Sequence, residues 1–212
     1  MTHSDETPDL QKAYALRTSD DSKALYRSWA ATYDETFAEA LGYAAPARIA
    51  AFFDSRWSGG GRVLDVGCGT GLVAEALAAR PVDGLDISAE MLGVAGAKGV
   101  YDRLIEGDLT ATLPIPDNVY GGLISAGTFT HGHVGPEALD ELVRIAVAGA
   151  LFVFGVNAEV FRELDFAASL TALEAAGRIS DVELVEGRIY EDAADHATAD
   201  DRFLATVFRK SV

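Results

Sequence analysis

The sequence predicts an α/β fold, a mostly parallel sheet with helices on both faces, preceded by a helical segment. Three observations lead to this prediction. From residue 62 onward, apolar runs of strand length alternate with stretches of helix length. The run 150–156 is apolar throughout, as expected for a strand that is buried on both faces. Only a short acidic stretch, 192–201, joins the last two strand patterns, which predicts a hairpin and an antiparallel last strand.

The N-terminal part carries helix signals. A proline early in the chain predicts a short helix over about 8–17. The capping cluster SDDS precedes a predicted helix over 22–41, and Gly42 ends it. A further proline begins a helix over 46–56, and SGGG then forms a turn at 58–61.

The alternating part follows this turn. The predicted strands are 62–66, 82–87, 101–108, 119–127, 150–156, 181–192 and 202–210. The predicted helices between them are 71–80, 88–97, 136–147 and 159–176. At 212 residues the chain predicts a single domain over 1–212. Its parts are a tail and short helix (1–20), a helical lid (21–58) and an α/β core (62–210).

Composition narrows the classes of function. The hydrophobic content of 49% excludes general disorder. The net charge of −16, with no basic patch, argues against a nucleic-acid substrate. Cys68 is the single cysteine, so neither an intrachain disulfide nor a cysteine-rich zinc site is expected. The polar, acidic N-terminus is unlike a signal peptide and no apolar stretch has the length of a membrane span, so we expect a cytoplasmic protein without a metal. The sequence leaves the oligomeric state open.

The segment VLDVGCGTG places glycines where a strand meets a helix. Such a cluster serves a tight turn or the close approach of a ligand to the backbone. The spacing of Gly67, Gly69 and Gly71 is one residue too short for the G-x-G-x-x-G that receives a pyrophosphate. Asp65, just before the loop, also disfavours a pyrophosphate and suits a ligand that carries an amino group.

Two further acids end the next two predicted strands. Asp86 follows the first glycine of the loop at the spacing typical of an acid that accepts hydrogen bonds from ribose hydroxyls. Asp108 ends the third strand, where it could accept from an adenine amine. Ile87 and Met91 offer apolar contact to an adenine face. The ends of parallel strands meet at one edge of the sheet, so these residues predict one nucleoside site.

VLDVGCGTG, VDGLDIS and EGDL together resemble the first three motifs of class I S-adenosylmethionine-dependent methyltransferases. The likeness in order of elements covers roughly 20–210. It implies a Rossmann-like seven-stranded sheet with an antiparallel last strand, a methyltransferase activity and S-adenosylmethionine as the cofactor. The residues it implies at the cofactor are Tyr26, Tyr33, Asp65, Gly67, Cys68, Gly69, Gly71, Asp86, Ile87, Met91, Asp108, Leu109 and Ser125.

The resemblance also implies roles. Gly67 and Gly69 would let the amino-acid part of the cofactor lie on the backbone, and Asp65 would help to hold its ammonium group. Asp86 would take the ribose hydroxyls. Asp108 and the amide of the following leucine would read the adenine edge. Cys68 is interpreted as a small residue of the turn, because direct methyl transfer needs no enzyme thiol.

The segment YRSWAATYDETF resembles the helix that covers the cofactor in many small-molecule methyltransferases. Together with SAGTFTHGHV it is similar to the methyltransferase-like family associated with the Williams–Beuren region. Aromatic residues fall on one helical face here. This face either packs into the core or directs the hydroxyls of Tyr26 and Tyr33 at the cofactor. His131 and His133 are either structural or available to remove a proton from the acceptor; these histidines and Tyr33 are the predicted catalytic residues.

The predicted function is methyl transfer to a nucleophilic oxygen or nitrogen of a small molecule by in-line displacement. The fourth strand ends in SAGT and lacks the Asn/Asp-Pro-Pro-Tyr/Phe of enzymes that methylate exocyclic amines of bases. This absence and the acidic composition favour a small-molecule substrate and argue against a nucleic-acid or membrane partner. Two alternatives remain: a non-catalytic protein that binds the cofactor or a partner, and an oxidoreductase that uses a nicotinamide dinucleotide.

Overall fold

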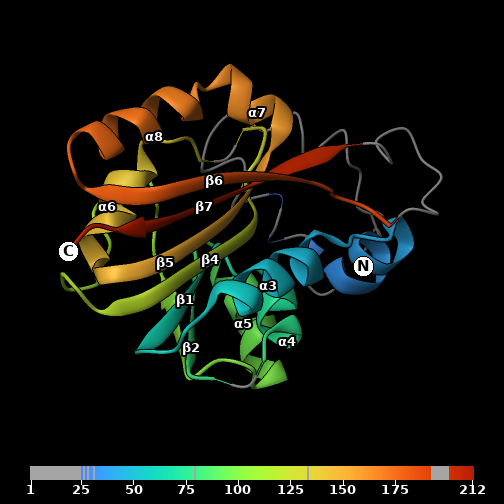
Figure 1. The fold of residues 1–212 in the computed structure, drawn as a ribbon. Helices are drawn as coiled ribbons and strands as arrows, with labels where there is room; N and C mark the ends of the chain where they lie inside the picture. Colours follow the sequence, from blue (N-terminus) through green and yellow to red (C-terminus); the bar gives the residue numbers. More distant parts are fainter. Residues whose placement is uncertain are drawn as a thin grey trace.

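A single mixed sheet forms the centre of the molecule (Figure 1). The computed structural model describes residues 25, 27, 29, 30, 32–78, 80–132, 134–191 and 201–212. The strands are β1 (Arg62–Val66), β2 (Val82–Asp86), β3 (Arg103–Glu106), β4 (Tyr120–Phe129), β5 (Ala146–Asn157), β6 (Ile179–Arg188) and β7 (Arg202–Lys210). The helices are η1 (Asp34–Glu39), α3 (Ala45–Arg56), α4 (Leu72–Ala76), α5 (Ala89–Lys98), α6 (Ala138–Ile145), α7 (Ala158–Glu163) and α8 (Phe166–Ala175).

The strand order is β3-β2-β1-β4-β5-β7-β6. The first five strands pair in parallel, and β7 runs antiparallel to both β5 and β6. This confirms the predicted Rossmann-like seven-stranded sheet with an antiparallel last strand. The order reverses beside β1, because the chain first builds outward to β3 and then returns to β4. In open α/β sheets ligands bind at such a switch point, beyond the carboxyl ends of the strands.

Alternating side chains of the strands bury two cores on opposite faces of the sheet. Leu64, Leu123 and Phe152 face the core that includes α6 and α8. Their neighbours in the sequence face the core that includes α3 and α4, together with Ile49 and Phe53. Figure 1 shows these two groups of helices on either side of the sheet. None of the helices in the described part of the chain is long and apolar enough to cross a membrane.

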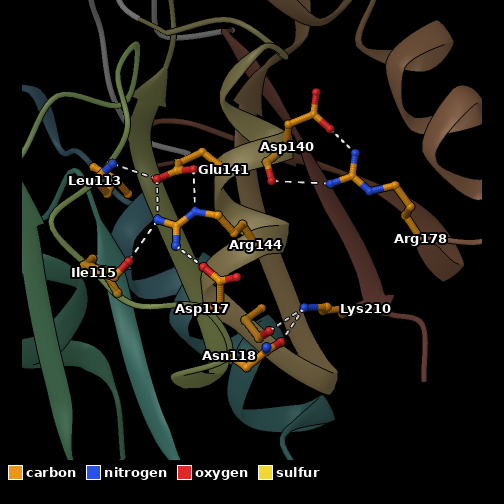
Figure 2. A network of polar contacts seen from close by, with 10 residues as sticks. Leu113, Ile115, Asp117, Asn118, Asp140, Glu141, Arg144, Arg178 and Lys210 are labelled. Carbon is orange, nitrogen blue, oxygen red and sulfur yellow. Dashed lines mark hydrogen bonds and ion pairs between the residues drawn. The ribbon is translucent and has the colours of Figure 1, made fainter.

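A polar network fastens the loop after β3 to α6 (Figure 2). The guanidinium of Arg144 bonds the Glu141 carboxylate, Asp117 and the carbonyl of Ile115. Glu141 also accepts from the backbone N–H of Leu113 at 2.7 Å. The Arg144 guanidinium holds the pKa of Glu141 below its usual value. This network positions the proline-bearing loop, and we assign it a structural role.

Two helix predictions differ from the structure. The predicted helix 22–41 is not one α-helix in its described part: a turn at Ala30 precedes the π-helix η1. At the end of this segment the N–H of Tyr43 donates to the carbonyl of Ala38, five residues earlier. This spacing is that of a π-turn, which is one residue longer than a turn of an α-helix. The predicted helix 159–176 is divided into α7 and α8 because Asp165 adopts a left-handed conformation and caps α8. The predicted helix 8–17 lies outside the described residues.

Candidate functional site

A hollow opens beyond the carboxyl ends of β1, β2 and β4, where the strand order reverses. We call it the glycine-loop hollow. Its wall consists of Tyr33, Tyr43, Pro46, Gly67, Cys68, Gly69, Thr70, Leu72, Val73, Leu85, Asp86, Ile87, Met91, Gly107, Asp108, Leu109, Thr110, Ala126, Gly127, Thr128 and Val134. Most of the residues that the sequence predicts at a nucleoside site therefore lie in one wall.

Two glycines of the loop have backbones that only glycine adopts easily. Gly67 has a φ of 68°, and a Cβ there would lie 2.0 Å from the hydroxyl of Thr128. Gly69 has a φ of 53°, yet a Cβ there would meet nothing within 4 Å. Gly67 is thus needed for packing between β1 and β4, whereas Gly69 leaves open space for a ligand at the backbone. The predicted contact of the loop with the cofactor's amino-acid part stays a prediction, and the open side of Gly69 has room for it.

Asp86 lies at the end of β2 and fixes the loop. Its carboxylate accepts the backbone N–H of Gly69 at 2.8 Å and that of Ser88 at 2.9 Å. Ser88 in turn caps α5 by accepting from the N–H of Met91. Burial raises the pKa of Asp86, and hydrogen bonding from the backbone N–H groups of Ser88, Gly69 and Ile87 opposes that shift. The carboxylate lies in the wall of the hollow and retains lone pairs for further donors.

The adenine side of the wall matches its prediction in position. Asp108 accepts from the backbone N–H and the hydroxyl of Thr110 through one oxygen. Leu109 and Met91 are buried in the wall, and Ile87 lies beside them. A carboxylate next to apolar side chains can bind a flat ring: the apolar side chains contact the face of the ring, and the carboxylate accepts from polar groups at its edge.

Asp65 is placed differently from its prediction. Its side chain is fully buried, is not part of the wall of the hollow, and accepts a hydrogen bond from the Tyr101 hydroxyl at 2.6 Å. The other carboxylate oxygen has no hydrogen-bond partner among the described residues. Burial raises the pKa of Asp65 to about 7, the Tyr101 bond lowers it, and the nearby charge of Asp86 raises it further. The ring of Tyr101 also packs next to Gly71. Asp65 therefore stabilises the glycine loop indirectly, through its hydrogen bond with Tyr101.

Cys68 is buried in the wall. Burial raises the pKa of its thiol well above the usual value, and the charges of Asp65 and Asp86 act in the same direction. A thiol with a raised pKa is a poor nucleophile. The side chain therefore acts as a small filler of the turn, in line with the interpretation from the sequence.

The segment before α3 closes one side of the hollow. Tyr33 lies in the wall and stacks on Phe37 with 4.9 Å between ring centroids. Asp34 accepts from the hydroxyl of Thr70 in the glycine loop at 2.6 Å and pairs with Lys98 of α5 at 2.6 Å. We call the contact among Asp34, Thr70 and Lys98 the lid latch. No sequence motif indicates it, because its members are far apart in the chain.

Besides Asp65, three predicted residues lie outside the wall in the described part of the chain. The hydroxyl of Ser125 is buried and donates to the carbonyl of Val66 at 2.7 Å. Gly71 begins α4 outside the wall. His131 approaches Glu159 at 3.4 Å, also outside it. Tyr26 and His133 lie outside the described residues.

A second hollow adjoins the first, and we call it the aromatic hollow. Its wall consists of Tyr33, Phe37, Tyr43, Ala45, Ala126, Gly127, Phe129, Thr130, Gly155, Asn157, Ile189, Tyr190 and Phe203. Tyr33, Tyr43, Ala126 and Gly127 belong to both walls. The two hollows are therefore neighbours, separated by the end of β4 and two tyrosines. The sequence predicts only Tyr33 of this second wall.

Residues 64–154, from β1 into β5, match a family model described as a methyltransferase domain. Over these residues the chain is similar to a methyltransferase domain. The match begins one residue before Asp65 and includes the glycine loop, Asp86 and Asp108. The sheet order and the antiparallel β7 agree with the class I fold, which confirms the resemblance that the motifs indicate.

Curated relatives of the methyltransferase domain match over part of their length. Malonyl-[acyl-carrier protein] O-methyltransferase of Pectobacterium atrosepticum is 38% identical over 100 residues, which are 46% of this chain and 39% of that protein. Human methyltransferase-like protein 27 is 36% identical over 125 residues, 56% of this chain and 51% of that protein. The chain thus spans about half the length or less of these relatives.

A solved structure extends the similarity of fold to most of the chain. It is a putative S-adenosylmethionine-dependent methyltransferase from Methanococcus maripaludis, with a TM-score of 0.60 and 18% identity, and the match covers 90% of this chain and 94% of that one. The solved structure is described as S-adenosylmethionine-dependent. The open space at Gly69 and the carboxylates of Asp86 and Asp108 in one wall fit the nucleoside and amino-acid parts of S-adenosylmethionine.

Proposed function

We propose that the protein transfers a methyl group from S-adenosylmethionine to a nucleophilic oxygen or nitrogen of a small molecule. One observation carries the proposal: the glycine-loop hollow shares a wall with a second hollow of different chemistry. When bound, the cofactor supplies an electrophilic methyl group on a sulfonium sulfur. The protein's part is to bind, orient and exclude water from the two reactants.

The residues of the glycine-loop hollow divide this task. Asp86 would accept from the ribose hydroxyls, and its bonds to Gly69 and Ser88 hold it in place for that contact. Asp108 and the backbone N–H of Leu109 would bind the adenine edge, with Met91 against the ring. These roles are proposals from position and chemistry.

Asp65 has a supporting role in this proposal. Its carboxyl is buried below the loop and does not reach the wall, so it acts on the ammonium group through the loop that it supports. Tyr101 keeps that carboxyl in place. In this proposal the indirect role replaces the direct contact with the ammonium group that the resemblance implies.

The acceptor proton has no assigned base in the described part of the two walls. Neither wall contains a histidine there, and His131 pairs with Glu159 outside them. Tyr33, in both walls, touches the boundary between cofactor and acceptor. We retain His133 as the proposed base for an acceptor that must lose a proton.

The acidic composition supports a small molecule over a nucleic acid as the acceptor. A net charge of −16 repels a phosphate backbone, and the aromatic wall offers no cation among its described residues. Each hollow is sized for small groups, and neither is an extended groove.

The experiment that tests this function compares two cofactors and then measures turnover. S-adenosylmethionine should raise the melting temperature, and a nicotinamide dinucleotide should not. At about a hundred times the dissociation constant the expected stabilisation is about 2.7 kcal/mol. Radiolabelled methyl groups should then appear in a product from a panel of small phenols and amines. Tight binding without turnover on any acceptor would favour the non-catalytic alternative, and a response to the dinucleotide alone would favour the oxidoreductase.

A further inference from the structure

The aromatic hollow differs in chemistry from the hollow beside it. Its described wall contains no charged side chain, whereas the glycine-loop hollow has two carboxylates. Rings follow one another along one side: Tyr33 to Phe37 at 4.9 Å, Phe37 to Tyr43 at 5.9 Å and Tyr43 to Tyr190 at 6.2 Å between centroids. A wall of rings favours an apolar, flat ligand, and without a compensating cation it disfavours an anion.

Asn157 places a polar group in this apolar wall. It ends β5, and its residue is only 6% exposed. Its side-chain oxygen caps α7 by accepting the backbone N–H of Glu159 at 2.9 Å and that of Val160 at 3.3 Å. The cap fixes which end of the amide is the oxygen, since only oxygen accepts. The amide nitrogen makes no hydrogen bond to any other described residue.

The buried Asn157 thus carries two N–H donors at the wall of an apolar hollow. The amide nitrogen is not fully enclosed by the protein, so a ligand oxygen in the hollow can accept from it without displacing a protein partner. The same donors repel a ligand cation. Asn157 ends β5, which pairs with β4, and Ala126 and Gly127 of β4 belong to the wall that the two hollows share.

We propose that the acceptor is an uncharged aromatic molecule that carries, besides its nucleophile, an oxygen that accepts a hydrogen bond from Nδ2 of Asn157. The proposal rests on the proposed function, because the aromatic hollow is the acceptor site only if the glycine-loop hollow holds the cofactor. It names a class, neutral aromatic rings with a carbonyl or ether oxygen, and it assigns Asn157 as the residue that selects within this class.

Three probes of nearly the same size separate the parts of the proposal. They are 4-hydroxyacetophenone, a neutral ring with a carbonyl; 4-ethylphenol, the same ring without it; and 4-hydroxybenzoate, the charged counterpart. Calorimetric titration at neutral pH, where phenols keep their proton, measures binding to the full chain with and without saturating S-adenosylhomocysteine. We expect the ketone to bind about three- to tenfold more tightly than the ethyl compound and at least about tenfold more tightly than the carboxylate.

Two variants test Asn157 itself. Asn157→Asp and Asn157→Ser both keep a side-chain oxygen that can cap α7, so the fold is retained, but neither has an amide N–H. In Asn157→Asp, whose carboxylate cannot donate, the ketone should bind no more tightly than 4-ethylphenol. In Asn157→Ser, which has one hydroxyl donor on a shorter side chain, the preference for the ketone should fall, while the affinity for 4-ethylphenol stays within about twofold of the unmodified protein. Circular dichroism confirms that α7 and the sheet remain.

The outcomes are distinct. Equal affinity for the ketone and the ethyl compound, tighter binding of the carboxylate, no binding of any probe, or an unchanged ketone preference in both Asn157 variants would overturn the proposal. A silent titration with S-adenosylhomocysteine would instead overturn the proposed function, and the probe ratios without cofactor would still report on the aromatic hollow.

Discussion

The two hollows are built in different ways from the same sheet. The glycine-loop hollow takes most of its wall from consecutive strand ends and the turns after them, between Gly67 and Thr128. The aromatic hollow takes its wall from the lid, the end of β5 and the β6–β7 hairpin, from Tyr33 to Phe203. The first is fixed by local backbone geometry and carries carboxylates, whereas the second is fixed by long-range packing of rings.

This difference explains what each hollow can be used for. A cofactor site that depends on glycine φ values and a cap such as Ser88 keeps its shape wherever the motif occurs. An acceptor site that depends on residues far apart in the chain can change with any one of them. In the proposed function, the glycine-loop hollow would therefore hold the cofactor and the aromatic hollow would select the acceptor.

The largest expected contrast concerns pH, because a titrating carboxyl lies under the glycine-loop hollow. The pKa of Asp65 is about 7 in the folded chain, against 3.8 for an unperturbed aspartate, so between these values the folded state binds more protons. The contribution of Asp65 to stability is full below about pH 4 and is lost as the pH rises to about 7, a change of about 4 kcal/mol. Urea titrations at several pH values in this range should show the free energy of unfolding falling as the pH rises. In Asp65→Asn this fall should be much smaller. Asp181→Asn, which alters an exposed carboxyl, is the control and should keep the pH dependence of the unmodified protein. The same pH dependence in Asp65→Asn would show that Asp65 does not cause it.

The next contrast separates packing from conformation in the glycine loop. Gly67→Ala should cost about 3 kcal/mol of unfolding free energy, because the new Cβ meets Thr128 in addition to the strain of a positive φ. Gly99→Ala is the matched control, with a φ of 67° and nothing within 4 Å of a Cβ, and should cost about 1 kcal/mol. Equal losses in chemical denaturation would show that Thr128 does not restrict this position.

A third contrast tests the nucleoside contact alone. Asp86→Ala should weaken the binding of S-adenosylhomocysteine by about 2 kcal/mol, because it removes a charge-assisted acceptor and frees the loop N–H of Gly69. Glu106→Ala, an exposed carboxyl opposite Asp86 on β3, should leave the affinity unchanged. Calorimetric titration measures the affinity of both variants. An unaltered affinity in Asp86→Ala would mean that the ribose binds elsewhere.

The smallest expected effect concerns the lid latch. Thr70→Val removes the hydroxyl that Asp34 accepts but keeps the shape of the side chain, so cofactor affinity should fall by about 1 kcal/mol. Hydrogen exchange should become faster in residues 32–41, while residues 150–156 of β5 barely change. Thr171→Val on α8 is the control. Equal hydrogen exchange in the unmodified protein, Thr70→Val and Thr171→Val would show that the lid latch does not stabilise residues 32–41.

The sequence predicts more residues of the glycine-loop hollow than of the aromatic hollow. The structure brings Asp86, Leu109 and Met91 together in one wall because strand ends and their turns are local features. The sequence misplaces Ser125, whose hydroxyl the neighbouring strand binds. Tyr190 and Asn157 could not be found, since only the pairing of β5, β6 and β7 brings them to Tyr33.

The fold was predicted in its strands and in its last pairing, but two helices were read as too long. Asp165 interrupts one of them, and its capping pattern DFAAS could have indicated the break. The π-turn in η1 has no local signal, because the rings of Phe37 and Tyr43 meet only in the folded chain.

The most direct test is a crystal structure of the full chain with S-adenosylhomocysteine. Density should fill the glycine-loop hollow, with the ribose hydroxyls within hydrogen-bond distance of Asp86, the backbone of Gly69 against the amino-acid part, and the sulfur toward the wall shared with the aromatic hollow. Density in another place, or an empty glycine-loop hollow at saturating ligand, would contradict the account.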